Sequence, residues 1–130
     1  MEVITVKSTA RAQFIDITEE VARRVREVQS GVCFLYVPHT TAGIVINEGA
    51  DPAVAEDILR IYEKLAPYEF SYRHLEGNSP AHVKSSLTGP CVSVLVEEGR
   101  LVLGTWQRIF FAEYDGPRTR KVYLKVLKDR

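Results

Sequence analysis

Several residue types and patterns are scarce in this chain, and each shortage narrows the class of protein. Cysteine occurs only twice, as Cys33 and Cys91, and each lies in an apolar run that predicts a buried strand. We therefore expect reduced thiols, which are too few to form a zinc site unaided. Lys plus Arg and Asp plus Glu number 17 each, so no overall field attracts nucleic acid or a membrane surface. No apolar run approaches the length of a membrane span.

Recognisable signals are also missing. The N-terminal residues show no basic region followed by an apolar region and a cleavage site, so we expect no signal peptide and a cytoplasmic protein. Nucleophile-elbow, P-loop, dinucleotide and cysteine–histidine catalytic patterns are absent, which disfavours the common covalent and nucleotide-dependent chemistries. What remains is a globular composition, with 45% hydrophobic and 26% charged residues. We expect residues 1–130 to form a single domain.

The hydrophobic pattern predicts mostly strands. Alternating or continuous apolar residues indicate strands at 3–9, 12–17, 32–37, 43–46, 91–97, 101–114 and 122–127. We expect the first two to pair with each other as antiparallel neighbours. Both faces of the stretch 105–115 are largely apolar, so both should be buried.

Three helices are expected between the strands. Thr18 is expected to cap the first helix, which Gly31 would end. Asp51 and Ser79 are each followed by proline, the pattern of a cap and a first helical residue. The former begins a long helix that ends before Pro67 and turns Val54, Ala55, Ile58, Leu59, Tyr62 and Leu65 inward, and the latter a short one through Leu87. The predicted fold class is α+β, with a mostly antiparallel sheet, two main helices and one short helix.

The most unusual stretch is 38–48, which places an imidazole, two hydroxyls, a carboxamide and a carboxylate beside β-branched residues. Buried polar groups need partners or they cost folding free energy. The stretch is therefore either a well-paired structural feature or a site. Asn47 and Glu48 should point to opposite faces of a regular strand, so we expect one of the two to be structural.

The chain has three histidines, His39, His74 and His82, and each is adjacent to turn or cap signals. Their spacing matches no local metal motif. Three histidines from separate loops can still bind a metal that keeps an open fourth position. The alternative is that they are structural histidines, hydrogen-bonded in the core.

His82 lies close to the expected helix start at Ser79, where free backbone amides could bind a phosphate or carboxylate. Lys84 and Ser85 follow closely. The alternative is a capped helix with a partly exposed histidine and a solvated lysine.

A second polar group lies between 105 and 118. Gln107 and Glu113 would be roughly 20 Å apart along a straight strand, so one small ligand cannot touch both within one subunit. The segment 115–118 is either a plain turn or a turn whose Arg118 clamps an oxyanion beside carboxylates. Glu48 and Glu76 are the remaining candidates for proton transfer.

Five motifs in the same order resemble the YjbQ-like family of small uncharacterised proteins, also labelled secondary thiamine-phosphate synthase. They are His39-Thr40-Thr41-Ala42 with Asn47-Glu48; His74 with Glu76-Gly77-Asn78; Pro80-Ala81-His82-Val83-Lys84-Ser85-Ser86; Gly104-Thr105-Trp106-Gln107; and Glu113 with Asp115-Gly116-Pro117-Arg118. The resemblance covers essentially the whole chain and has no departure at these positions.

The resemblance implies an α+β homotrimer with a polar pocket near the subunit contacts. It implies that His39, His74 and His82 bind a metal or an anion, with a divalent metal, zinc or magnesium, as candidate cofactor. Carried over in the same way, Glu48, His82 and Gln107 are the candidate catalytic residues. The candidate ligand- or anion-binding residues are Thr40, Asn47, Lys84, Ser85 and Arg118.

Three hypotheses follow. The first is a small enzyme that acts on a phosphorylated or anionic metabolite, related to the joining of a pyrimidine diphosphate to a thiazole phosphate. The second is a non-catalytic metal-binding or ligand-binding trimeric module. The third is a structural trimer whose histidines merely pair polar groups at the interface. None of them needs a nucleic-acid or membrane partner.

Overall fold

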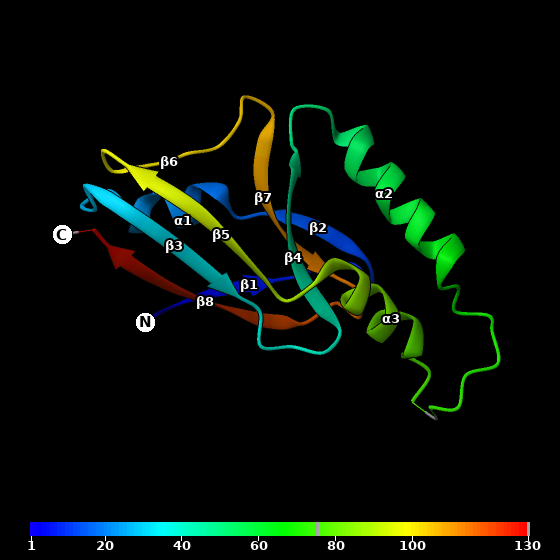
Figure 1. The fold of residues 1–130 in the computed structure, drawn as a ribbon. Helices are drawn as coiled ribbons and strands as arrows, with labels where there is room; N and C mark the ends of the chain where they lie inside the picture. The colour runs from blue at the N-terminus through cyan, green and yellow to red at the C-terminus, as the bar shows by residue number, and fades with distance from the viewer. Residues whose placement is uncertain (75, 130) are drawn as a thin grey trace.

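The computed structural model describes residues 1–74 and 76–129. Eight strands in these residues form two sheets, with three helices around them (Figure 1). The strands are β1 (Glu2–Lys7), β2 (Gln13–Asp16), β3 (Ser30–Tyr36), β4 (Ala42–Glu48), β5 (Cys91–Glu97), β6 (Arg100–Leu101), β7 (Gln107–Glu113) and β8 (Thr119–Lys128). The helices are α1 (Thr18–Arg24), α2 (Pro52–Leu65) and α3 (Ser79–Thr88). The α+β class is confirmed.

All strand pairings are antiparallel within the described residues, and they divide the strands between two sheets. The larger sheet has the order β1-β8-β3-β5-β6, and the smaller one the order β2-β7-β4. Along the described residues the chain changes sheet six times, and two of these crossings, between β3 and β4 and between β7 and β8, lie at the same end of the smaller sheet. These two crossings define where the polar residues gather.

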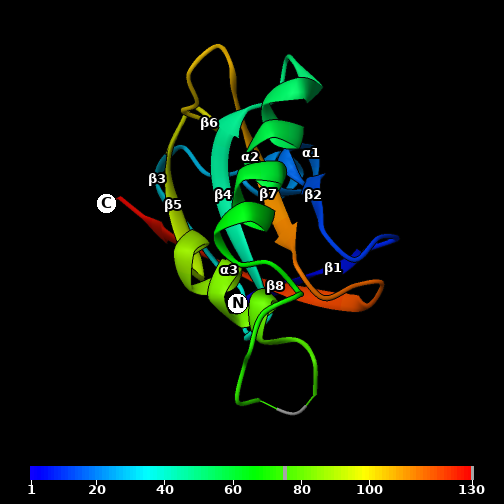
Figure 2. The ribbon, with the colours of Figure 1, turned by 90° about the vertical axis from the view of Figure 1, so that its right-hand side faces the viewer.

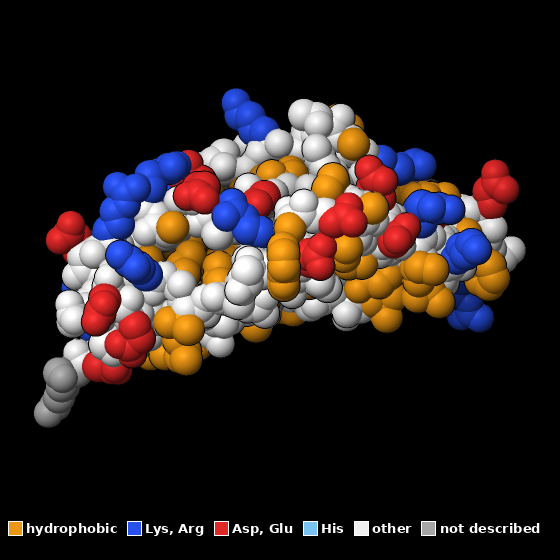
Figure 3. All heavy atoms as spheres, turned by 90° about the horizontal axis from the view of Figure 1, so that it is seen from above, with side chains coloured by type: hydrophobic (Ala, Val, Ile, Leu, Met, Phe, Trp, Pro, Cys, Tyr) orange, Lys and Arg blue, Asp and Glu red, His pale blue; other side chains and the backbone are white. Residues whose placement is uncertain are grey.

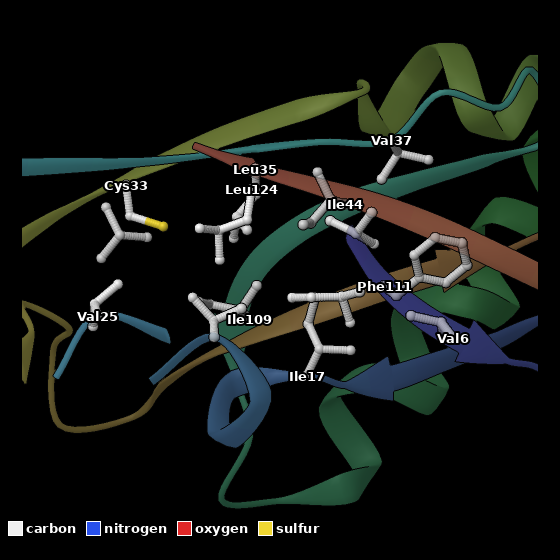
Figure 4. Close-up of a cluster of buried hydrophobic side chains, with 14 of the residues drawn as sticks. Val6, Ile17, Val25, Cys33, Leu35, Val37, Ile44, Ile109, Phe111 and Leu124 are labelled. Carbon is white, nitrogen blue, oxygen red and sulfur yellow. The ribbon is translucent and has the colours of Figure 1, made fainter. Parts of the chain in front are cut away.

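The main core lies between the two sheets (Figure 4). Cys33 and Leu35 of β3 belong to the same buried cluster as Ile109 and Phe111 of β7, because alternate residues of each strand point toward the opposite sheet. The first helix, α1, contributes Val21 to this cluster. Burial in this core raises the pKa of the Cys33 thiol to about 11, so that thiol stays protonated and behaves as an apolar side chain.

The helices α2 and α3 lie on the other side of the smaller sheet (Figure 2). Ala81 of α3 packs with Ala112 and Tyr114, and Leu59 and Tyr62 of α2 contact this second cluster. A Cβ atom at Gly43 would lie 2.7 Å from the carbonyl oxygen of Gly89, so glycine in β4 is what lets the end of α3 approach the sheet.

The expected pairing of the first two strands is wrong. The first strand, β1, pairs with β8, and β2 pairs with β7 in the other sheet. The stretch 101–114 is likewise two strands, β6 in the larger sheet and β7 in the smaller. Alternation identifies a strand and its buried face, but it does not say which strand lies beside it.

Two of the three expected helix starts are displaced. Residue Ile17 occupies the cap position of α1, and Thr18 instead accepts a hydrogen bond from the backbone N–H of Ile109. Helix α1 ends at Arg24, and Gly31 lies inside β3. At α3, Asn78 holds the cap position and Ser79 is the first helical residue.

The start of α2 is as expected, because the Asp51 side chain accepts a hydrogen bond from the N–H of Ala53 and proline follows. The inward stripe of α2 is only half-buried, and Leu65 is 64% exposed. No residue of α2 is buried. Within the described residues, none of the helices combines the length and apolarity that crossing a bilayer demands.

Candidate functional site

The three histidines converge on one cavity of about 470 Å³. Residue His39 lies in the β3–β4 crossing, His74 in the segment before α3, and His82 in the first turns of α3. The β7–β8 crossing supplies Asp115 and Arg118 to the same cavity. The β3–β4 connection and the start of β8 lie close to α3 (Figure 1), so the site is built where the chain changes sheets.

His39 is fixed by a backbone contact. Its Nε2 accepts a hydrogen bond of 3.0 Å from the N–H of Lys121. Burial, reinforced by the nearby Arg120 guanidinium, holds the pKa of His39 below its ordinary value. The ring is therefore neutral near pH 7, and because Nε2 is an acceptor, Nδ1 carries the proton and is its donor.

His74 and His82 face each other edge-on, with 5.4 Å between their ring centroids. The carboxylate of Glu76 lies 3.8 Å from Nε2 of His74. The two rings come from different segments, the irregular stretch after α2 and helix α3 itself, so they define two walls of the cavity.

Asp115 connects two further cavity residues. Its Oδ2 accepts a hydrogen bond of 2.7 Å from Nη2 of Arg118 and one of 3.0 Å from Nδ2 of Asn78. The Arg118 side chain is 52% exposed and also donates from Nε to the Asp115 carbonyl. The segment 115–118 is thus a turn that places an arginine beside a carboxylate. The oxyanion clamp, one of the two interpretations from the sequence, needs this geometry.

A buried pair, Glu113 and Arg120, lies behind the cavity and was missed in the sequence analysis as part of the site. The guanidinium of Arg120 binds both carboxylate oxygens of Glu113. A signal was present: Arg120 is in phase with the buried Val122 and Leu124 of β8, and Glu113 with the buried Phe111 of β7. Two charges in phase with core residues on successive strands predict a buried ion pair.

The pKa of Glu113 reflects two opposed effects. Burial alone would raise it, but hydrogen bonds from Arg120 and Ser8 outweigh burial and hold the pKa of this carboxyl below its usual range. The donor hydroxyl of Ser8 lies 2.7 Å from Oε1 of Glu113. The pair is therefore ionised at neutral pH.

Several predicted site residues lie elsewhere. Glu48 and Gln107 face each other across β4 and β7, at the end of the strands opposite to Ala42 and Glu113. Six residues of strand correspond to roughly 20 Å, so one chain does not bring these two side chains to the histidines. The Asn47 side chain is exposed and accepts a hydrogen bond from the N–H of Glu48.

Lys84 and Ser85 do not line the histidine cavity. The side chain of Lys84 is 2% exposed, forms an ion pair with Glu63 and lies over the Tyr68 ring. The Ser85 hydroxyl donates to the carbonyl of Ala42. An adjoining hollow of about 350 Å³ is lined by Ser85 together with Thr40 and His82. Of these residues, Thr40 and His82 also line the histidine cavity.

The arrangement of His39 bears on the predicted metal. Its Nε2 lone pair is occupied by the Lys121 N–H, and its Nδ1 carries the proton, so the ring must turn before it can bind a metal. Across residues 1–74 and 76–129, no three His, Cys, Asp or Glu side chains are placed to hold a metal ion together. The three-histidine metal site remains a prediction.

Comparison with known proteins identifies the family of this chain. A family model described as UPF0047 protein YjbQ-like matches residues 2–129. The UPF0047 protein YugU of Bacillus subtilis is 50% identical over 98% of each chain. A UPF0047 protein of Archaeoglobus fulgidus is 51% identical over 95% of this chain and 98% of its own.

Solved structures agree. A crystal structure of an uncharacterized conserved protein of the yjbq/upf0047 family from Clostridium acetobutylicum is 48% identical, with a TM-score of 0.95 over 98% of this chain and 100% of that one. A conserved hypothetical protein from Thermus thermophilus is 46% identical, with a TM-score of 0.93 over 98% of this chain and 100% of that one. Sequence and structure together therefore show that the chain belongs to the UPF0047 family of YjbQ-like proteins.

Proposed function

We propose that this chain is a small enzyme that acts on a phosphorylated or otherwise anionic metabolite held in the histidine cavity. The observation that carries the proposal is the convergence of three histidines with Arg118 and Arg120 on one cavity. Guanidinium and imidazole N–H groups are strong donors to phosphate oxygens. A cavity of about 470 Å³ has the size of a small-molecule site.

The resemblance to proteins labelled secondary thiamine-phosphate synthase supplies the candidate reaction. A thiazole nitrogen would form a bond to the pyrimidine methylene carbon while the bond from that carbon to the diphosphate oxygen breaks. The electron pair leaves with pyrophosphate. The guanidinium groups would stabilise the charge that develops on this leaving group, and His82 would supply its proton.

A divalent metal stays a candidate cofactor. Magnesium binds largely through substrate phosphates and one or two carboxylates, so it does not need a complete set of protein ligands. Asp115 and Glu76 line the cavity and carry the carboxylates for such a role. Zinc would need the histidines, and hence the rotation of His39 described above.

The test is a calorimetric titration with inorganic pyrophosphate, with and without magnesium, on protein whose metal content is measured by elemental mass spectrometry. We expect the wild type to bind and His82→Gln to bind several-fold more weakly. The matched control is Glu48→Gln, which alters a residue at the far end of β4 and should bind as the wild type does. Absence of binding by the wild type under both conditions would refute the proposal.

Turnover separates an enzyme from a ligand-binding module. We expect the wild type to release pyrophosphate from hydroxymethylpyrimidine diphosphate when thiazole phosphate is present, and His82→Gln to lose most of that rate. Pyrophosphate binding without turnover would favour the non-catalytic module. We also propose that the chain assembles as a homotrimer, which the exposed apolar residues of α2 support.

A further inference from the structure

Arg120 is held more firmly than any other guanidinium that lines the histidine cavity in the described part of the chain. Its Nε donates to both oxygens of Glu113, at 2.9 and 3.2 Å. Its Nη2 donates to the same carboxylate and, at 2.8 Å, to the hydroxyl of Thr41. Only 4% of the residue is exposed. The side chain is therefore fixed in one orientation.

One nitrogen of this guanidinium is left over. Across residues 1–74 and 76–129, Nη1 of Arg120 has no hydrogen-bond partner in the protein. In the same residues, the side-chain nitrogens and oxygens that lack both a partner and any contact with solvent are Nε of Arg24 and Oδ1 of Asn78. Nη1 is not among these atoms, and Arg120 lines the cavity. Nη1 is therefore in contact with solvent, and the histidine cavity is the space that Arg120 lines.

The comparison with Arg118 decides which arginine binds more strongly. Arg118 is half exposed, and its Nε and Nη2 are engaged by Asp115 at the surface. An anion that binds Arg118 must compete for this guanidinium with Asp115 and with water. Arg120 is already ordered and shielded from water, so a contact with it loses little entropy and is weakly screened.

We infer that Nη1 of Arg120 donates a hydrogen bond to the oxyanion that binds in the histidine cavity, with Glu113, Thr41 and Ser8 as positioning residues. The inference rests on the proposed function, because it assigns the contact for the same anionic ligand. Nδ1 of His39 is a second donor on a residue that lines this cavity. The ligand class is a compound with a tetrahedral phosphate or diphosphate group, whose oxygens can accept from donors in different directions.

Glu113 makes the inference sharper. Its carboxylate neutralises Arg120 at close range, so it stabilises the folded chain while it weakens the attraction of the cavity for an anion. Replacement of Glu113 by glutamine should keep a hydrogen-bond acceptor for Arg120 and remove the negative charge. Stability and anion affinity should then change in opposite directions.

The experiment is a pyrophosphate titration by calorimetry on folded variants, with folding checked by circular dichroism and thermal unfolding. Lysine cannot present a planar fork, so Arg120→Lys should lose about tenfold or more in affinity. Arg118→Lys should lose less. The matched control is Arg108→Lys, in which an arginine bound to Asp16 at the other end of β7 is changed, and its affinity should equal that of the wild type.

Glu113→Gln keeps the inference testable if Arg120→Lys does not fold. We expect this variant to melt at a lower temperature and to bind pyrophosphate more tightly than the wild type. A folded Arg120→Lys that binds as the wild type does, or a Glu113→Gln that binds more weakly, would overturn the inference and leave the proposed function standing. A wild type that binds no pyrophosphate would remove both.

Discussion

Three charged side chains are almost completely buried among residues 1–74 and 76–129, and their charges are compensated in different ways. Glu113 and Arg120 are buried and bind each other. Lys84 is 2% exposed, but its carboxylate partner, Glu63, is 48% exposed. The Tyr68 ring lies 4.6 Å from Nζ of Lys84 and provides a second favourable contact for its charge.

Lys84 should therefore be replaceable. The cost of burying its charge offsets most of what the ion pair returns, so we expect Lys84→Met to change the free energy of unfolding by less than about 1 kcal/mol or to raise it. Pyrophosphate affinity should stay at the wild-type value, because Lys84 does not line the histidine cavity. Urea unfolding and the titration described above measure both quantities. If a folded Lys84→Met variant bound pyrophosphate more weakly than the wild type, Lys84 would have to be counted among the anion-binding residues.

The Glu113–Arg120 pair makes stability depend on pH. The pKa of Glu113 is lowered in the folded state from the ordinary value of 4.5, so the pair stabilises the fold above that pH. This contribution is lost as the pH falls from about 4.5 through the folded pKa, where the carboxylate is protonated. We expect Glu113→Gln to be less stable than the wild type by about 2 kcal/mol near pH 7, and the gap to narrow as the pH falls toward about 3. Urea unfolding at several pH values measures the gap, and a constant gap would contradict this account.

At the scale of helices and strands, the position of an element could be predicted from its own residues, but the strands that pair with it could not. The Asp51 cap with its following proline, and the strand β5 at 91–97, match the sequence predictions because each depends on neighbouring residues alone. The neighbours of β1 and β2 depend on residues more than 90 positions away. The changes of sheet near residues 8–12 and 102–106 leave the apolar pattern unchanged, so a pattern cannot reveal them.

The same distinction explains what was predictable in the site. From the sequence, the three histidines could either share a site or be separate structural histidines, and the structure places all three on one cavity. Asn78 shows what the sequence pattern could not predict. Its side chain donates a hydrogen bond to Asp115 and makes no cap bond to α3, although it holds the cap position that the pattern assigned to Ser79. Glu48 and Gln107 were grouped with the histidines because their motifs resemble those of the family. The order of motifs does not show how far apart two residues lie along β4 and β7.

At the scale of the molecule, α2 is an amphipathic helix whose apolar residues are only partly covered. Ile61 is 53% and Leu65 is 64% exposed, and no residue of α2 is buried. Figure 3 shows hydrophobic side chains among charged ones of both signs on the face seen from above. Exposed apolar residues of this kind are typical of surfaces that contact another protein molecule.

We expect the wild type to have three times the mass of a single chain by light scattering after size-exclusion chromatography. A charge at the centre of a buried interface is costly, so Ile61→Glu should shift the protein toward the single-chain mass while circular dichroism stays unchanged. Glu56→Gln on the same helix is the control. A wild type with the mass of one chain would contradict the trimer. If Ile61→Glu were still a trimer, the interface would not include this part of α2.

The β3–β4 and β7–β8 crossings also set the stage of synthesis at which the site can form. Its donors are drawn from His39, from the start of α3 and from Arg118 and Arg120, and the Ser8 hydroxyl that supports Glu113 lies 105 residues before it. During synthesis, a nascent chain that ends before β8 has the histidines and Arg118, but it lacks Arg120, the arginine that we propose as the fixed donor. Ligand therefore cannot guide the early steps of folding, and it can stabilise only a chain whose last strand has already joined β1 and β3.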